Sequence, residues 1–175
     1  MDATTFTIRP IVEQDWNEYR QLRLQMLEEI PIAFGERLES ARILPEGAWR
    51  SRCRRGTGGN SIRFAAIEDA TGRWLGSMGG FLSADDGNRP VLVGVYVVPG
   101  SRGTAAGITD ALLAAVEHWA LRFGDTLLLH VHEDNPRAIG AYEKRGFVPT
   151  GTTVPYPMDT SQRELEMVKR LETSP

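Results

Sequence analysis

The feature that most constrains the fold is the segment from Val95 to Ile108, where an apolar strand runs into a glycine-rich turn that opens a helix. Residues 90–98 are almost continuously apolar, which is typical of a strand buried in a sheet. Glycines follow at positions 100, 103 and 107, and apolar residues then recur with the helical period. Such a turn directs several backbone N–H groups at one point, where the helix dipole adds positive charge. The segment therefore suits a pyrophosphate, to which Arg102 would add a charged fork.

Two common phosphate-binding motifs do not describe this turn. The sequence has no Gly-Lys-Ser or Gly-Lys-Thr triplet, as a P-loop requires. The spacing of Gly100, Gly103 and Gly107 also differs from the Gly-x-Gly-x-x-Gly pattern of dinucleotide-binding folds. An ordinary strand-to-helix turn, with glycines that serve packing, remains an alternative for this segment taken alone.

The rest of the chain alternates between strand and helix patterns. Strands are predicted at residues 6–9, 62–68, 73–82, 90–98, 126–132, 147–150 and 164–170. Helices are predicted at 13–29, at 38–55 with a break near Pro45, at 108–123 with Gly124 as C-cap, and at 136–145 with Asn135 as N-cap. Pro155 and Pro157 are placed in a loop between the last two strands. This order predicts one α/β (α+β) domain over residues 1–175 with a mixed sheet.

Composition excludes several classes of protein. With 41% hydrophobic and 25% charged residues the chain is in the globular range, and a net charge of −3 argues against a general polyanion binder. One cysteine excludes an internal disulfide and a cysteine-ligated metal site, and three histidines offer little for a zinc cluster, so no metal is expected. No apolar stretch reaches the length of a membrane span and the start lacks an export signal. We therefore expect a cytoplasmic protein without nucleic-acid or membrane partners.

A second informative segment runs from Asn135 to Phe147. Ala138, Ala141 and Tyr142 fall on one face of its predicted helix. Small residues allow a ligand or a strand to approach this face, from which Tyr142 projects a hydroxyl group. A half-buried packing tyrosine is the alternative interpretation.

Together the two segments resemble the GNAT superfamily of N-acetyltransferases. The pattern Arg/Gln-x-x-Gly-x-Gly/Ala corresponds to residues 102–107, although Ala105 stands where the pattern has its central glycine. The later pattern Asn-x-x-Ala-x-x-x-Tyr-x-Lys-x-Gly-Phe is matched in register by Asn135, Ala138, Tyr142, Lys144, Gly146 and Phe147. The resemblance covers about residues 5–170.

The resemblance implies a centrally splayed sheet of six to seven strands with about four helices, and an acetyl-CoA site where the fourth and fifth strands separate. Backbone groups of Val95, Tyr96 and Val97 would then bind the pantetheine arm, and the Val97 N–H would polarise the thioester carbonyl. The pyrophosphate would be held by the amides of Gly103, Thr104, Ala105, Ala106, Gly107 and Ile108. Asn135, Ala138 and Lys144 would complete the cofactor site, and Tyr142 would be the general acid for the departing thiolate.

The implied activity is transfer of an acetyl group from acetyl-CoA to a primary amine of a small molecule or peptide, by direct attack in a ternary complex. Such an enzyme is an acyltransferase, and members of this superfamily are often homodimers. Ala105 and the lack of a carboxylate on residues 91–98 leave an alternative open, namely a non-catalytic acetyl-CoA sensor or scaffold.

The sequence offers several general bases and does not choose among them. The candidates are Glu28, Glu29, His130, His132, Glu133 and Asp134, and a chain of water molecules would serve instead. The acceptor pocket is expected between residues 26–34 and the loop 155–158.

A run of four arginines lies within residues 50–55. A nucleic-acid or CoA-phosphate site is one interpretation, but no aromatic residues are interleaved, and a solvated helix face is favoured. Cys53 in this run has no histidine partner arrangement and is expected to be inert.

Overall fold

The computed structural model describes residues 4–103 and 107–173. Its strands are β1 Phe6–Pro10, β2 Ser61–Glu68, β3 Trp74–Ser83, β4 Arg89–Val97, β5 Thr126–His132, β6 Val148–Tyr156 and β7 Asp159–Arg170. Its α-helices are α1 Trp16–Glu29, α2 Leu38–Arg42, α3 Glu46–Arg55, α4 Ile108–Ala120 and α5 Pro136–Glu143. Short 3-10 turns are η1 Glu13–Asp15, η2 Pro31–Ala33 and η3 Pro99–Ser101.

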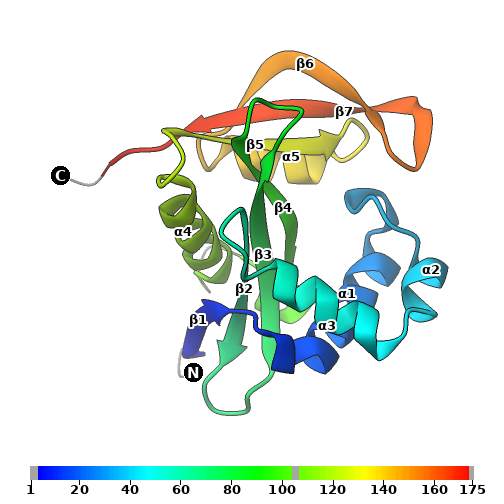
Figure 1. Ribbon diagram of the computed structural model, residues 1–175. Helices are drawn as coiled ribbons and strands as arrows, with labels where there is room; N and C mark the ends of the chain where they lie inside the picture. Colours follow the sequence, from blue (N-terminus) through cyan, green and yellow to red (C-terminus); the bar gives the residue numbers. More distant parts are fainter. Residues whose placement is uncertain (1–3, 104–106, 174–175) are drawn as a thin grey trace.

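The strands form one seven-stranded mixed sheet in the order β1-β2-β3-β4-β5-β7-β6. Every neighbouring pair is antiparallel except β4 and β5, which run parallel. Those two strands pair only at Val91 with Leu128 and at Leu92 with Leu129, so they separate beyond Leu92. The predicted central splay is therefore confirmed, and Figure 1 shows it in the middle of the sheet.

A bulge in β4 changes the direction of its side chains just before the splay. Tyr96 pairs with Ser77 and Val93 pairs with Gly79, so between these two pairs β4 contains one residue more than β3. The backbone of Gly94 takes the bulge with a φ of +62°, which glycine adopts without a steric cost. Because of the extra residue, Val93 and Tyr96 point to the same face of the sheet.

Helices cover both faces of the β2–β4 part of the sheet. In Figure 1, α4 lies on one side of these strands and α1 with α3 on the other. The α4 contact is close, because a Cβ atom on Gly80 of β3 would lie 2.7 Å from Cζ3 of Trp119. On the opposite side the fully buried Trp49 of α3 packs edge-on against Tyr19 of α1.

Some predicted boundaries are wrong, for local reasons. Helix α4 ends at Ala120 rather than at the predicted Gly124, because tighter turn bonds from Arg122 to Trp119 and from Phe123 to Ala120 replace the helical pattern. Pro155 lies within β6 and not in a loop, which is allowed because β6 is an edge strand. The break near Pro45 is confirmed and yields two helices, α2 and α3.

Within residues 4–103 and 107–173, no helix has the length and apolar character needed to cross a membrane.

Candidate active site

The free edge of β4 lies beside the splay. The N–H of Val98 donates to the Leu75 carbonyl of β3 over 2.8 Å. Because successive residues of a strand direct their backbone groups to opposite sides, the N–H groups of Val97 and Val95 point away from β3, toward β5. Since β5 pairs only with Val91 and Leu92, this stretch of β4 has no strand partner on that side among the described residues.

The turn that follows β4 needs glycine at two described positions. Gly103 has a φ of +111°, and Gly107, the N-cap of α4, has a φ of +68°. The helix then begins at the buried Ile108, as predicted. Thr104, Ala105 and Ala106, which were predicted to bind the pyrophosphate, lie outside the described residues.

Arg102 is bound by protein groups near the end of β4. Its Nε donates to the Val97 carbonyl over 2.7 Å, and its Nη2 lies 2.6 Å from Oε1 of Glu29 at the end of α1. The hydroxyl of the buried Tyr96 donates to Oε2 of the same carboxylate. Partial burial acts to raise the pKa of Glu29, but the hydrogen bonds from Tyr96 and Arg102 outweigh it and the pKa is lowered. This cluster ties α1 to the splayed end of β4.

Sequence reasoning missed the connections within this cluster. Glu29 was considered only as a base, Tyr96 only for its backbone and Arg102 only as a phosphate ligand. Glu29 and Tyr96 are 67 positions apart, and no local spacing links them. The one signal was their position at element ends, Glu29 as the last residue of α1 and Tyr96 next to the end of β4.

Helix α5 presents Tyr142 with its hydroxyl unengaged. Asn135 caps the helix as predicted, accepting from the Ala138 N–H over 3.3 Å, and Lys144 forms the other cap. The half-buried ring of Tyr142 packs edge-on against Phe147 with centroids 5.7 Å apart. Burial raises the pKa of the Tyr142 phenol from 10.0 to about 12, although the charge of Arg145 acts in the opposite direction. Across the described chain, no protein group hydrogen-bonds the Tyr142 hydroxyl.

The histidines of β5 are occupied by structural contacts. His132 is buried, its Nδ1 accepts from the Asp134 N–H over 3.0 Å, and its Nε2 lies 2.6 Å from Oε1 of Gln162. His130 Nε2 lies 3.4 Å from Oε2 of Glu166. Together with Asp86, His130 and Glu166 bring their potential metal-ligand atoms within 4.8 Å of one another, a grouping that the sequence did not predict.

The glutamates that the sequence offered as general bases also make contacts within the protein. Glu133 accepts from the Arg163 N–H over 3.0 Å, and the exposed Glu28 lies 3.5 Å from Arg42. Of the two glutamates that end α1, Glu29 contacts β4 and Glu28 does not.

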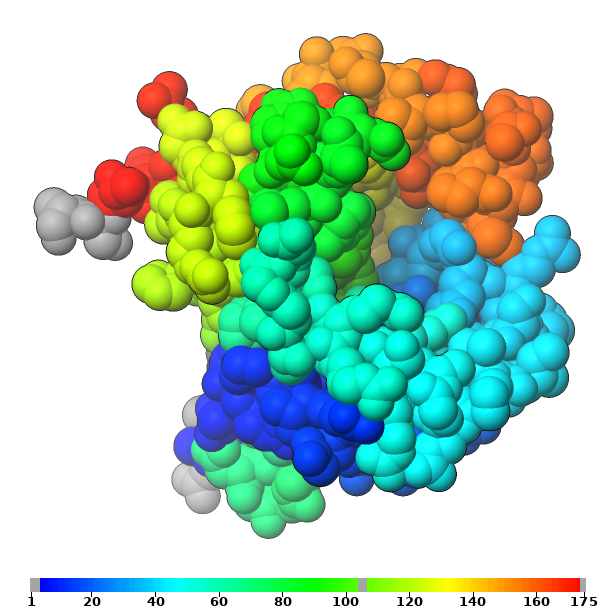
Figure 2. Space-filling view, viewed as in Figure 1, coloured from blue at the N-terminus to red at the C-terminus, as the bar shows by residue number. Residues whose placement is uncertain are grey.

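Two cavities lie on the α1 side of the molecule. One of 310 Å³ is bounded by Leu27, Glu28, Pro31, Ile32, Tyr156 and Met158, the two segments expected to wall the acceptor pocket. The other, of 540 Å³, lies between α1, α3 and the strands β2–β4, and Val93 and Phe81 line its strand side. Figure 2 shows a hollow in the surface where three segments of the chain come together, around residue 35 (light blue), residue 55 (cyan) and residue 93 (green). Glu36 lines both cavities.

The arginine run is largely paired within the chain. Arg50 binds Glu46 over 2.7 Å, Arg52 binds Glu36 over 2.5 Å and Arg54 binds Glu13 over 2.7 Å. Between them, the side chain of Cys53 is buried, and this burial raises the pKa of its thiol to about 11. The sequence favoured a solvated helix face for this run, whereas Arg52 and Arg54 bind carboxylates of other segments; the buried thiol agrees with the expectation that Cys53 is inert.

Comparison with known proteins gives a family and a fold. The model of the acetyltransferase (GNAT) family matches residues 22–147. A search of curated protein sequences found no significant match. A GCN5-related N-acetyltransferase from Kribbella flavida is similar at 21% identity, with 95% of this chain and 98% of that one covered and a TM-score of 0.71.

Two further solved structures show the same fold. A putative acetyltransferase, yncA, from Salmonella typhimurium, solved with acetyl-CoA, has 16% identity, coverage of 98% and 97%, and a TM-score of 0.73. Nourseothricin acetyltransferase has 25% identity over 65% of this chain and 66% of its own, with a TM-score of 0.55. The splayed seven-stranded sheet and the family match over residues 22–147 agree, and the chain belongs to the GNAT family of acetyltransferases.

Proposed function

We propose that this chain transfers an acetyl group from acetyl-CoA to a primary amine, by direct attack within a ternary complex. The observation that carries the proposal is the free edge of β4 at Val95–Val97, which is followed by a turn at the N-terminus of α4. The family match and the acetyl-CoA present in the Salmonella typhimurium relative support the choice of donor.

The described residues fit this donor. The N–H groups of Val95 and Val97 face the splay and suit the amide groups of a pantetheine arm. Gly103 and Gly107 on either side of the turn have positive φ values, and the N-terminus of α4 favours a pyrophosphate there. In the proposal, Ile108, Asn135, Ala138 and Lys144 also belong to this site, and Thr104, Ala105 and Ala106 complete the turn.

In the chemical step, the lone pair of the amine nitrogen forms the new C–N bond while the C–S bond of the thioester breaks. The Val97 N–H would stabilise negative charge that develops on the carbonyl oxygen. Tyr142 would donate its phenolic proton to the departing thiolate sulfur. Its hydroxyl is not held by another described group. Burial raises its pKa to about 12, which keeps the phenol protonated over the physiological range and also makes it a weaker acid than a free phenol.

We assign the proton lost by the amine to water rather than to a protein carboxylate. Glu29 is the acidic side chain that contacts the end of β4, but its carboxylate is bound by Tyr96 and Arg102. The same bonds lower its pKa, and a carboxylate with a lowered pKa is a weak base at neutral pH.

The proposal is tested by measuring thiol release from acetyl-CoA across a panel of primary amines, together with calorimetry of acetyl-CoA binding. Amine-dependent thiol release is expected. Binding of acetyl-CoA without release on any amine would favour the alternative, a sensor or scaffold that keeps the fold without turnover. Absence of acetyl-CoA binding would refute both.

A further inference from the structure

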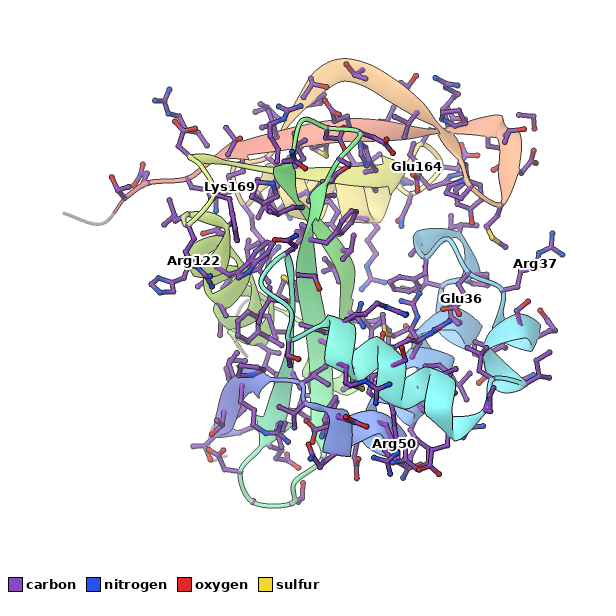
Figure 3. The ribbon with its side chains drawn as sticks, in the orientation of Figure 1. Glu36, Arg37, Arg50, Arg122, Glu164 and Lys169 are labelled. Carbon is purple, nitrogen blue, oxygen red and sulfur yellow. The ribbon has the colours of Figure 1, made fainter. Side chains whose placement is uncertain are left out.

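The 540 Å³ cavity carries an excess of positive charge. Its lining includes four arginines, Arg23, Arg52, Arg55 and Arg63, against the single carboxylate of Glu36. They come from α1, α3 and β2, so only the folded chain gathers them. In Figure 3, Glu36 lies on the segment that leads to α2, next to α3, whose Arg52 binds it.

Two of the arginines are used to hold Glu36. Arg52 approaches it as a fork, with Nη1 at 3.1 Å from Oε2 and Nη2 at 2.5 Å from Oε1, and Nε of Arg23 donates to Oε2 over 3.0 Å. Burial acts to raise the pKa of Glu36, but the two guanidinium groups outweigh it and the pKa is lowered. The carboxylate is therefore saturated with donors and has little capacity left for the other two arginines.

Arg55 and Arg63 have no carboxylate partner among residues 4–103 and 107–173. Arg63 donates from Nη1 to the Tyr19 hydroxyl over 2.6 Å, and its guanidinium lies 4.8 Å from the centre of that ring. Arg55 has only a long contact of 3.4 Å to the Ser51 hydroxyl. Arg55 is exposed and Arg63 is partly buried, so both guanidinium groups have donors that a bound anion can reach from solvent.

The cavity and the splayed end of β4 lie on the same face of the sheet. Val93 lines it, and the bulge at Gly94 puts Tyr96 on the same face three residues later, which is about 10 Å along a strand. Arg23 and Glu29 lie six residues apart on α1, about 9 Å along a helix. A molecule that reaches from the cavity to the free edge of β4 thus spans roughly 10 Å.

From this arrangement we infer that the acetyl acceptor carries an anionic oxygen group, a carboxylate or a phosphate, which Arg55 and Arg63 bind while the amine reaches the end of β4. This places the acceptor in the 540 Å³ cavity and not in the 310 Å³ cavity, where the sequence predicted it. The inference rests on the proposed function. Ile62, Phe81 and Val93 add apolar surface to the same cavity and suit a carbon chain between the two groups. The volume of 540 Å³ fits a small molecule, since such pockets measure about 300–1,000 Å³.

The test compares matched amines of similar length: 6-aminohexanoate as the carboxylate arm, 4-aminobutyl phosphate as the phosphate arm, and 1,6-diaminohexane and hexylamine as the cationic and neutral arms. Thiol release gives kcat/KM for each. The wild-type protein is expected to prefer an anionic amine over hexylamine and the diamine by at least about tenfold, the order expected of a charge-assisted hydrogen bond. The better of the carboxylate and phosphate arms identifies the group.

Variants then locate the anion. Arg55→Gln and Arg63→Gln should each reduce the preference about tenfold, through KM, and Arg55→Lys should restore part of it. Arg50→Gln is the control, because Arg50 is on the same helix, pairs with Glu46 and does not line the cavity. Figure 3 shows Arg50 and Glu36 on opposite sides of α3.

The outcomes separate this inference from the proposed function. Equal or better turnover of hexylamine or the diamine, or the same preference in Arg55→Gln as in Arg50→Gln, overturns the inference and leaves acetyl transfer standing. If no amine releases thiol, the proposed function fails. Calorimetry with inorganic phosphate and with glutarate then tests whether the cavity binds an anion. Binding lost in Arg55→Gln and kept in Arg50→Gln would support an anion site, whereas no binding of either anion would overturn it.

Discussion

Replacing Tyr142 by phenylalanine removes the proposed acid and almost nothing else. The ring contact with Phe147, at 5.7 Å between centroids, is retained. Since no described group hydrogen-bonds the hydroxyl, its loss leaves no buried partner unsatisfied, and the free energy of unfolding should change by less than about 0.5 kcal/mol. The variant therefore isolates the chemistry from the fold.

The kinetic effect of Tyr142→Phe should be large and confined to kcat. A positioned general acid contributes roughly 10²–10⁴-fold, so kcat should fall by at least about 100-fold, while the Kd for acetyl-CoA stays within about twofold. Stopped assays of thiol release give kcat, calorimetry gives the Kd, and thermal unfolding checks the fold.

The pH dependence supplies a second test of the same residue. Burial raises the pKa of the phenol to about 12, so the acid form persists as pH rises past the ordinary value of 10.0. The wild-type kcat should therefore show no decline from loss of this proton below about pH 11. Unchanged kcat in Tyr142→Phe, or an equal loss of kcat and of acetyl-CoA affinity, would refute the acid assignment.

Three further predictions concern the packing of the sheet, the burial of Cys53 and the contacts of Arg102. Gly80→Ala should lower the free energy of unfolding by about 1–3 kcal/mol, because its Cβ would lie 2.7 Å from Trp119. Gly47→Ala in α3, whose Cβ would meet nothing within 4 Å, should instead raise the free energy of unfolding by about 0.5–1 kcal/mol. Chemical denaturation measures both values, and equal effects of the two substitutions would contradict the packing of α4 on Gly80. Cys53, buried with its pKa raised to about 11, should resist a thiol reagent at pH 8 in the native protein and react on unfolding; fast native reaction would contradict its burial. Arg102→Gln should raise the Kd for acetyl-CoA several-fold by calorimetry, because it releases the bonds from the turn to Val97 and Glu29; an unchanged Kd would show that these bonds do not position the turn.

Local patterns were sufficient for most elements, whereas the central splay was expected only from the resemblance to the GNAT superfamily. Periodicity and turn chemistry placed β5 at residues 126–132 and the start of α4 at Ile108, because these signals lie within a few residues of one another. The predictions for Gly124 and Pro155 failed because tertiary context decided them: α4 ends in a tight turn, and an edge strand tolerates proline.

The contacts that join distant segments could not be predicted from the sequence. Glu29, Tyr96 and Arg102 meet only because α1 ends where β4 splays. Arg55 was part of a visible run, but nothing local distinguished it from Arg50, Arg52 and Arg54, which bind carboxylates of the chain. Only the fold brings Arg63 of β2 beside it.

The most direct test of the central claim follows the acetyl group itself. The protein is incubated with acetyl-CoA labelled in the acetyl group and with 6-aminohexanoate or another amine of the panel, and mass spectrometry locates the label. We predict one labelled acetyl on the amine for each CoA thiol released, no labelled protein, and initial rates that intersect when both substrates are varied. Label found on the protein with parallel initial-rate lines would contradict direct attack, and bound acetyl-CoA with no labelled amine would contradict acetyl transfer altogether.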